Sequence, residues 1–247
     1  YEVLCNLHGV KCKKWKFNKS LSLEINDLKK IITNKTKVIF LVNPNLPIEF
    51  EFNDKLKKEI YKMCIKKNII IAYDEAYYHF GSKTEIKNAI TKKNIIVMRT
   101  FSKAWGLPSI RLGFLVTNKK LCEYISKCRS LVETNALSYQ IAMWALSNKK
   151  ILNNHVSQIK SGSKFIHKNL KKSNITFRGG NVTNAVLIKL NSKKEAEDLR
   201  VHMRKKKIYI RGNFKEKIEN YIRISLGPIN KMKIFIKAFD NWLKIRK

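Results

Sequence analysis

One lysine of this chain has surroundings that suit a reactive group. Lys103 lies in the segment RTFSKAWGLPSIRLGF (99–114), beside Phe101 and Trp105. A lysine held among aromatic and apolar groups loses proton affinity, because desolvation disfavours its charged form. The neutral amine is then a nucleophile toward aldehydes. Taken alone, an ordinary surface lysine is the better interpretation, since this chain is rich in lysine and lysines are mostly solvated.

An acid and a phenol precede this segment. Asp74 directly follows the apolar run NIIIAY (68–73), where a bare carboxylate at the edge of a sheet is costly. A protonated ring nitrogen, such as that of a pyridoxal cofactor, would relieve the cost; the alternative is a helix N-cap. Tyr77 would lie near Asp74 if the chain turns helical there, and its hydroxyl could bond a phenolic oxygen of the cofactor. The alternative for Tyr77 is a buried ring with a solvated hydroxyl.

Further polar residues also follow expected strands. Ser102 and Arg111 could hold a phosphate, Arg111 through a charge-assisted fork, although Arg111 could equally be an exposed strand residue. Asn43 and Asn45 follow the apolar run KVIFLV (37–42). Sites of open α/β sheets lie at the carboxyl ends of the strands, so we expect these groups to gather at one edge.

The elements that must position these residues begin with a strand–helix–strand unit. Runs 37–42 and 68–73 read as buried strands, and the amphipathic stretch 52–67 between them reads as a helix capped by Asn53 or Asp54. This order indicates a parallel sheet covered by helices. Two more strand candidates, 94–101 and 109–116, extend the pattern.

The second half of the chain reads differently. Residues 119–171 are mainly helical, with one helix through 139–146, and an alternating α+β pattern follows from about residue 173. The sequence thus predicts an α/β part in 1–135, connecting helices in 136–172 and a smaller α+β domain in 173–247. The last of these is expected to hold strands at 174–177, 183–190, 208–212 and 221–227, a helix at 193–206 and a closing helix with Pro228 in its first turn.

The net charge of +34 raises the question of nucleic-acid binding. Arg is scarce beside Lys, whereas phosphate and base recognition favours Arg, and the lysines are spread over every segment. We therefore expect no specific nucleic-acid partner. No apolar run is long enough to span a bilayer. The five cysteines show no metal-binding or disulfide spacing, so we expect no metal and reduced thiols in a cytoplasmic protein.

The segments YDEAYYHF (73–80) and RTFSKAWGLPSIRLGF resemble the fold-type I, pyridoxal-phosphate-dependent aminotransferases. They are most similar to the histidinol-phosphate aminotransferase family, whose pattern reads DEAY, then RTFSKA, then GLxxxRxG. The resemblance runs from YEVLCNLHG at the start of the chain to YIRISLG (221–227). It implies the fold of a large cofactor-binding domain followed by a small C-terminal domain, with pyridoxal 5'-phosphate as the cofactor.

The resemblance also implies roles for individual residues. Lys103 would bond to the cofactor aldehyde and shuttle a proton, and Asp74 would pair with the pyridinium nitrogen. Tyr77 would contact the phenolic oxygen, and Ser102 and Arg111 would hold the phosphate. Arg223 would bind the carboxylate or phosphate of the substrate, with Arg211 as a helper beside it.

The implied enzyme is a cytoplasmic homodimer of amino-acid biosynthesis. It would move an amino group between an amino acid, with glutamate the expected donor, and a small phosphorylated carbonyl compound. A decarboxylase of an amino-acid phosphate would share this fold and most of these residues, so it stays an alternative. A truncated relative that binds polyanions and catalyses nothing is a third hypothesis.

The chain departs from the family pattern in two places. The family loop NPNNPTG reads NPNLPIE here, so Leu46 stands for the Asn expected to bond the cofactor, and Ile48 and Glu49 stand for Thr and Gly. We expect a reshaped loop in which Asn43 or Asn45 could supply the missing bond. Family chains are also longer at the N-terminus, so a chain beginning at Tyr1 is expected to be a fragment or a trimmed product.

Overall fold

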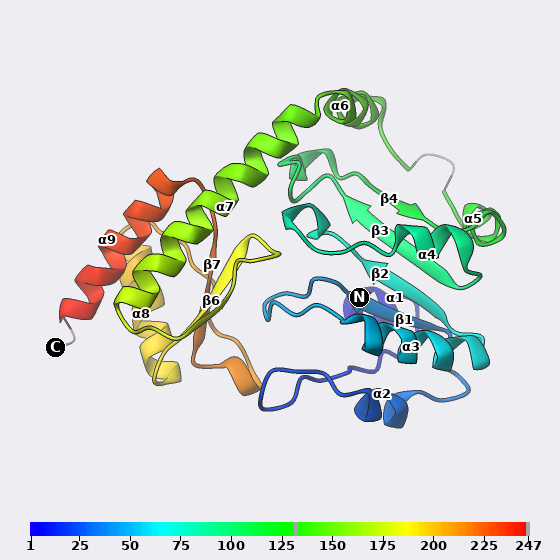
Figure 1. Ribbon diagram of the computed structural model, residues 1–247, viewed down its shortest axis with the longest axis horizontal. Helices are drawn as coiled ribbons and strands as arrows, with labels where there is room; N and C mark the ends of the chain where they lie inside the picture. Colours follow the sequence, from blue (N-terminus) through cyan, green and yellow to red (C-terminus); the bar gives the residue numbers. More distant parts are fainter. Residues whose placement is uncertain (131–132, 246–247) are drawn as a thin grey trace.

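The computed structural model describes residues 1–130 and 133–245 and contains two separate sheets. Figure 1 shows the larger sheet on one side and the smaller on the other, and the long helix α7 (Lys149–Lys172) running from α6 to the smaller sheet. We call the larger sheet with its helices the N-terminal unit and the smaller sheet with its helices the C-terminal unit. Within the described ranges, no helix is both long enough and apolar enough to cross a bilayer.

The larger sheet has the order β1-β2-β3-β4. Strands β1 (Val38–Val42), β2 (Ile70–Asp74) and β3 (Ile95–Thr100) pair in parallel, as the strand–helix–strand pattern predicts. Strand β4 (Gly113–Val116) is antiparallel to β3, so extending the parallel pattern to 109–116 was wrong in direction. The loop from 101 to 112 closes on itself and returns the chain beside β3, whereas a parallel neighbour needs a crossover along the sheet.

Helices cover one face of this sheet. The side chain of Asn53 caps α3 (Asp54–Lys66) by accepting from the Leu56 N–H at 2.8 Å, which decides between the two expected caps. Helices α2 (Ile25–Ile31), α3 and α4 (Ile86–Thr91) contribute Leu28, Ile60, Cys64 and Ala89 to one buried cluster with strand residues such as Ile71 and Val97. The short helix α1 (Glu2–Leu7) precedes this unit, and α5 (Lys119–Ser126) follows β4.

The predicted helical stretch contains α5, α6 (Ala136–Ser147) and α7. Residues 131–132 of that stretch, and 246–247 of the closing helix, lie outside the described residues. Helix α7 continues from α6 into the C-terminal unit, where it packs on α9 (Ile229–Ile245).

The smaller sheet is antiparallel, with the order β5-β6-β7. Its strands are β5 (Phe177–Gly179), β6 (Ala185–Lys189) and β7 (Tyr221–Ser225), and helix α8 (Lys193–Lys205) follows β6. The expected strand 174–177 therefore begins three residues late. The expected strand 208–212 is reduced to a single bridge between Arg211 and Arg223, because positive φ angles at Lys207 and Asn213 end the extended backbone on both sides.

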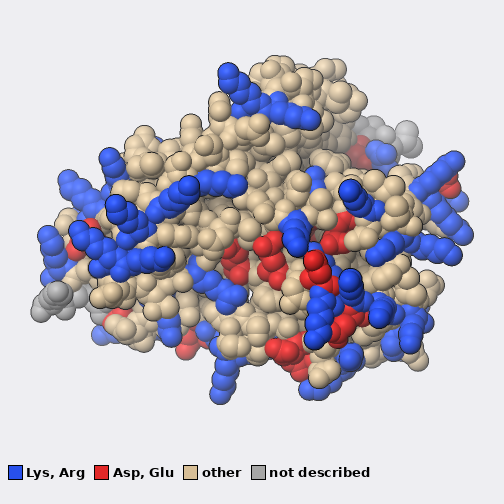
Figure 2. All heavy atoms as spheres, in the orientation of Figure 1, with Lys and Arg blue, Asp and Glu red and all other residues tan. Residues whose placement is uncertain are grey.

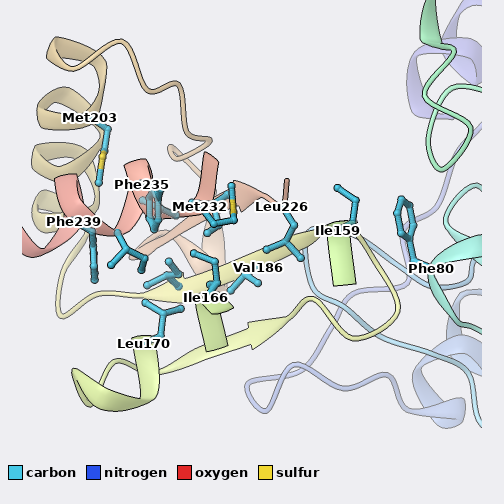
Figure 3. Close-up of a cluster of buried hydrophobic side chains, with 14 of the residues drawn as sticks. Phe80, Ile159, Ile166, Leu170, Val186, Met203, Leu226, Met232, Phe235 and Phe239 are labelled. Carbon is cyan, nitrogen blue, oxygen red and sulfur yellow. The ribbon is translucent and has the colours of Figure 1, made fainter. Parts of the chain in front are cut away.

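A second buried cluster joins the two units. Figure 3 shows most of it between α7, α9 and the smaller sheet, with Phe80 reaching it from the N-terminal unit beside Ile159. Phe101 and Trp105, which flank Lys103, belong to the same cluster. The lysine loop is therefore packed against the helix that carries the C-terminal unit.

The closest approach in this region involves Gly162 of α7. A Cβ placed on Gly162 would lie 1.8 Å from the carbonyl oxygen of Gly227, in the turn between β7 and α9. Only a glycine allows the helix and the turn to meet at this distance. At Gly227 itself, a Cβ would make ordinary contacts of 3.6 Å or more with side chains.

Replacing Gly162 should therefore cost far more than replacing its partner. We expect Gly162→Ala to lower the free energy of unfolding by about 3 kcal/mol or more, because backbone atoms must move apart in a packed core. Gly227→Ala is the matched control and should change it by less than about 1 kcal/mol. Urea unfolding measures both, and equal midpoints for the two variants would contradict this packing.

Candidate functional site

The parallel strands bring the expected site residues of the N-terminal unit to one edge. Val42 and Asp74 are register partners, and the N–H of Asn43 donates to the Asp74 carbonyl at 2.9 Å. Strand β3 ends at Thr100, just before Ser102 and Lys103. The predicted gathering at the carboxyl edge is thus present in the backbone.

The Asp74 carboxylate is oriented by two donors. Its Oδ1 accepts from the Ala76 N–H at 3.0 Å, and its Oδ2 accepts from the Tyr1 hydroxyl at 2.5 Å. The Tyr1 ring stacks on Phe40 with centroids 4.3 Å apart. Burial raises the pKa of the Tyr1 phenol, and the hydrogen bond to Asp74 raises it further, so this phenol stays protonated and donates. The sequence gives no sign of Tyr1, because the contact spans 73 positions along the chain.

Lys103 and Tyr77 lie together. The Lys103 Nζ is 5.4 Å from the centroid of the Tyr77 ring, within the range of a cation–π contact. Lys103 is half-buried, whereas the sequence suggested a buried lysine; its neighbour Trp105 is buried instead. The loop is held from two sides, since Gly106 N–H donates to the Lys103 carbonyl at 3.0 Å and His155 of α7 contacts the Ala104 carbonyl at 2.7 Å.

The expected phosphate ligands, Ser102 and Arg111, bond to other groups of their own segment. Ser102 lies in a turn in which its N–H donates to the Thr100 hydroxyl at 3.0 Å, and that hydroxyl donates to the Ser102 Oγ at 3.0 Å. Thr100 is a further hydroxyl at this edge that the sequence analysis did not single out. Arg111 is exposed, has a left-handed φ of 51°, and donates through its guanidinium to the Pro108 carbonyl at 3.0 Å.

The two loop asparagines serve the loop itself. Asn43 is buried, and its Oδ1 accepts from the Phe52 N–H at 3.0 Å. Asn45 forms a bridge with Phe50, whose carbonyl accepts the Asn45 N–H at 2.9 Å. These contacts of Asn43 and Asn45 hold the turn after β1, and the role of the two residues toward a cofactor stays a prediction.

A buried ion pair between Glu75 and Arg99 lies next to Asp74 at this edge of the sheet. The Glu75 carboxylate is fully buried and accepts from Arg99 Nε at 3.1 Å and Nη2 at 2.9 Å. It also accepts from the Thr84 hydroxyl at 2.8 Å and the Glu85 N–H at 2.6 Å. Glu85 in turn pairs with Lys57 at 2.8 Å. Sequence reasoning missed this network, although Glu75 stands next to Asp74 and Arg99 opens the lysine segment.

The expected substrate arginines lie in the C-terminal unit. Arg223 and Arg211 exchange backbone hydrogen bonds of 2.7 and 3.0 Å, and the Nε of Arg223 is buried without a partner. Across the sheet, Arg178 pairs with Leu187, which pairs with Arg223. Directly opposed residues of antiparallel strands share a face, so Arg178 joins the same row. The register alone reveals Arg178.

On the face that Figure 2 shows, the positive charge is not gathered in a single patch. Figure 2 shows Lys and Arg side chains over both units on the visible face, with most of the acidic side chains of that face in its central and lower part. This distribution fits the composition-based interpretation of the lysine excess. Among the described residues, no three His, Cys, Asp or Glu side chains gather as a metal site would require.

Comparison with known proteins gives consistent matches. The family model described as "Aminotransferase class I and II" matches residues 1–239. The chain is 27% identical over 246 residues to the histidinol-phosphate aminotransferase of Methanocaldococcus jannaschii, covering 97% of this chain and 65% of that protein. It is 31% identical to the one from a Hydrogenobaculum species, covering 96% and 66%. The chain thus spans just under two thirds of the length of these curated relatives.

Solved structures share the fold. The histidinol-phosphate aminotransferase of Sinorhizobium meliloti, solved in complex with pyridoxal-5'-phosphate, superposes with a TM-score of 0.86 at 20% identity, over 100% of this chain and 68% of that one. The one from Clostridium acetobutylicum gives 0.84 at 24% identity, over 96% and 73%. These likenesses confirm the expected fold class, a mainly parallel sheet with helices followed by a smaller α+β part.

The buried ion pair makes a testable contribution to stability. Arg99→Met leaves the fully buried Glu75 carboxylate without its charge partner, so we expect the free energy of unfolding to fall by about 3–5 kcal/mol. Lys30→Met removes the exposed pair with Asp27 and serves as the control, with an expected change below about 1 kcal/mol. If urea unfolds both variants at the same concentration, Glu75 does not depend on Arg99.

Proposed function

This chain belongs to the family of class I and II aminotransferases, and we propose that it carries the cofactor-binding and substrate-binding residues of an aminotransferase of the histidinol-phosphate kind. The proposed reaction moves an amino group from an amino acid, with glutamate as donor, to a small phosphorylated carbonyl compound. The observation that carries the proposal is the placing of Lys103 against Tyr77, at the sheet edge that also holds Asp74.

The residues at this edge fit pyridoxal 5'-phosphate by their chemistry. Asp74 offers a carboxylate already oriented by Ala76 and Tyr1, which suits a protonated ring nitrogen. The Lys103 amine suits an aldehyde, and the Ser102 hydroxyl and the Arg111 cation suit a phosphate. When bound, the cofactor would supply an electron sink for negative charge on the substrate carbon.

The departure at Leu46 changes one part of this set. An apolar side chain stands where the family pattern has an amide, so Tyr77 is left as the proposed hydroxyl donor to the phenolic oxygen. Asn43 could assist only by donating from its amide nitrogen, because its side-chain oxygen can only accept and is bonded to the Phe52 N–H. We therefore assign the phenolic contact to Tyr77.

In the proposed reaction, Lys103 holds and moves the proton at the substrate carbon. Lys103 is half-buried and its Nζ lies over the Tyr77 ring, so the amine can reach a bound substrate while the ring shields one side of it from water. The reaction has two halves: the donor gives up its amino group and leaves as the corresponding oxo acid before the acceptor binds, so ping-pong kinetics are expected.

We assign the substrate anion to the arginines of the smaller sheet. The unpartnered, buried Nε of Arg223 is a donor whose desolvation is uncompensated in the chain itself, and an anionic ligand group would satisfy it. Arg211, bridged to Arg223 through the backbone, would assist.

The proposal includes the division into a large cofactor-binding domain within 1–135, connecting helices in 136–172 and a small domain in 173–247. It also includes a homodimer. Helix α6 supports the dimer, because Leu137, Tyr139 and Trp144 are apolar or aromatic and more than half exposed, which is typical of a surface that pairs with another.

The role of Lys103 is tested by adding pyridoxal phosphate and then borohydride. We expect a visible absorption band and a reduced adduct that mass spectrometry locates on Lys103, and Lys103→Ala should lose both. Lys164→Ala, which removes an exposed lysine of α7, is the control for surface labelling in a lysine-rich chain. An adduct spread over surface lysines, with no band that depends on Lys103, would contradict the proposal.

The reaction type is tested next on the same protein. With glutamate and the carbonyl partner of histidinol phosphate, we expect amino transfer, and we expect Arg223→Lys to raise KM at least about tenfold because the bidentate fork is lost. Release of carbon dioxide from an amino-acid phosphate, without amino transfer, would instead establish the decarboxylase alternative.

A further inference from the structure

The loop that departs most from the family pattern is tied to the cofactor side of the site. It runs from Asn43 to Phe50, directly after β1. Its first residue bonds the main chain of Asp74, and the bridge between Asn45 and Phe50 closes it. A change in the position of this loop would therefore shift the backbone beside Asp74.

Glu49 connects this loop to the C-terminal unit. Its carboxylate accepts from three successive backbone N–H groups, those of Gly180 at 3.0 Å, Asn181 at 3.2 Å and Val182 at 3.1 Å. It also accepts from the Thr183 hydroxyl at 2.6 Å and from the Asn181 side chain at 3.3 Å. Successive N–H groups that converge in this way form a concave anion site, and here the chain fills it with its own carboxylate.

The shape of this anion site depends on two glycines. Gly179 and Gly180 have φ angles of +95° and +82°, which side chains rarely adopt. A Cβ on Gly180 would lie 2.8 Å from the Ser163 Oγ. Helix α7 holds the same turn, because Ser163 donates to the Gly180 carbonyl at 2.6 Å and His167 contacts the Gly179 carbonyl at 2.9 Å. The site that receives Glu49 is therefore rigid and built into the C-terminal unit.

The neighbours of Glu49 strengthen the same connection. Ile48 is buried in an apolar cluster with Leu187 and Ile218 of the C-terminal unit. The Glu49 carbonyl accepts from Arg178 Nε at 3.3 Å. Since Arg178 and Leu187 lie in the row that leads to Arg223, both residues that depart from the Thr-Gly pattern contact the arginine row or its support.

We propose that Glu49 is a positioning residue that fixes the arginine row of the smaller sheet against the loop beside Asp74. In the aminotransferase proposed above, on which this role rests, Glu49 sets the place of the substrate anion relative to Lys103. It touches neither substrate nor cofactor. It acts through the turn 180–183 and Arg178, and the negative charge is needed because every partner of the carboxylate is a hydrogen-bond donor.

The connection itself is tested by hydrogen exchange, without any assay of activity. In Glu49→Gln and Glu49→Ala, the amides of the turn 180–182 should exchange at least about tenfold faster than in the unmodified chain. Glu51→Gln removes an equal charge two residues away at an exposed position and should leave these amides unchanged. Unchanged exchange in the Glu49 variants, or equal acceleration in Glu51→Gln, would overturn the proposal.

Rescue separates a carboxylate effect from loss of packing. Acetate added to Glu49→Ala should restore amide protection in the turn, since it can enter the vacated anion site, whereas chloride at equal ionic strength should not. If acetate does not restore amide protection, packing and not charge holds the turn. That result would overturn the role of the carboxylate.

The effect on the reaction is measured as a split between KM and kcat. For the phosphorylated substrate, Glu49→Gln should raise KM at least about fivefold with kcat within about twofold, while the Lys103-dependent absorption band stays unchanged. An unchanged KM would overturn the positioning role. If the band itself is missing from the unmodified chain, the proposed function fails, whereas the exchange result on the turn stands independently.

Discussion

The arrangement of this protein depends on the parallel register of β2 with its two neighbours. That register aligns Val42, Asp74 and Met98, so the segments leaving the three strands emerge at one edge. The edge would be electrostatically costly without the ion pair beneath it, because Glu75 is fully buried directly after Asp74. Arg99 neutralises that charge from strand β3, four positions before Lys103.

A second constraint is the close packing that joins the two units. Helix α7 approaches the turn at Gly227 through Gly162, and its His155 holds the main chain next to Lys103. Three aromatic residues of the N-terminal unit belong to the same buried cluster as the core of the C-terminal unit: Phe80, Phe101 and Trp105. The loop after β1 adds a connection through Glu49. The two units are thus linked twice, by the apolar packing around α7 and by the Glu49 carboxylate in a backbone anion site.

The excess of lysine leaves this framework largely untouched. Lysine stems are long and their amines strongly hydrated, so most of these side chains stay on the surface of both units. Lys57 is an exception, being buried and paired with Glu85. Lys103 is another, and its setting differs in kind: it faces the Tyr77 ring, with no acid paired to it in the described contacts.

The sequence by itself determined most of the element types and the parallel pairing of three strands, and it predicted that Asp74 and the Lys103 segment follow strands at one edge of the sheet. Apolar runs, turn residues such as Gly and Pro, and motif spacing are local signals, so they can be read from short stretches of sequence. Only the tertiary structure decided the direction of β4, the loss of a strand at 208–212, the contact of Tyr1 with Asp74 and the use of Glu49. Each of these depends on a backbone turn or on partners far apart in the chain. The N–H groups that bind Glu49 converge only when Gly179 and Gly180 adopt positive φ angles. No local sequence pattern near Glu49 could therefore predict this contact.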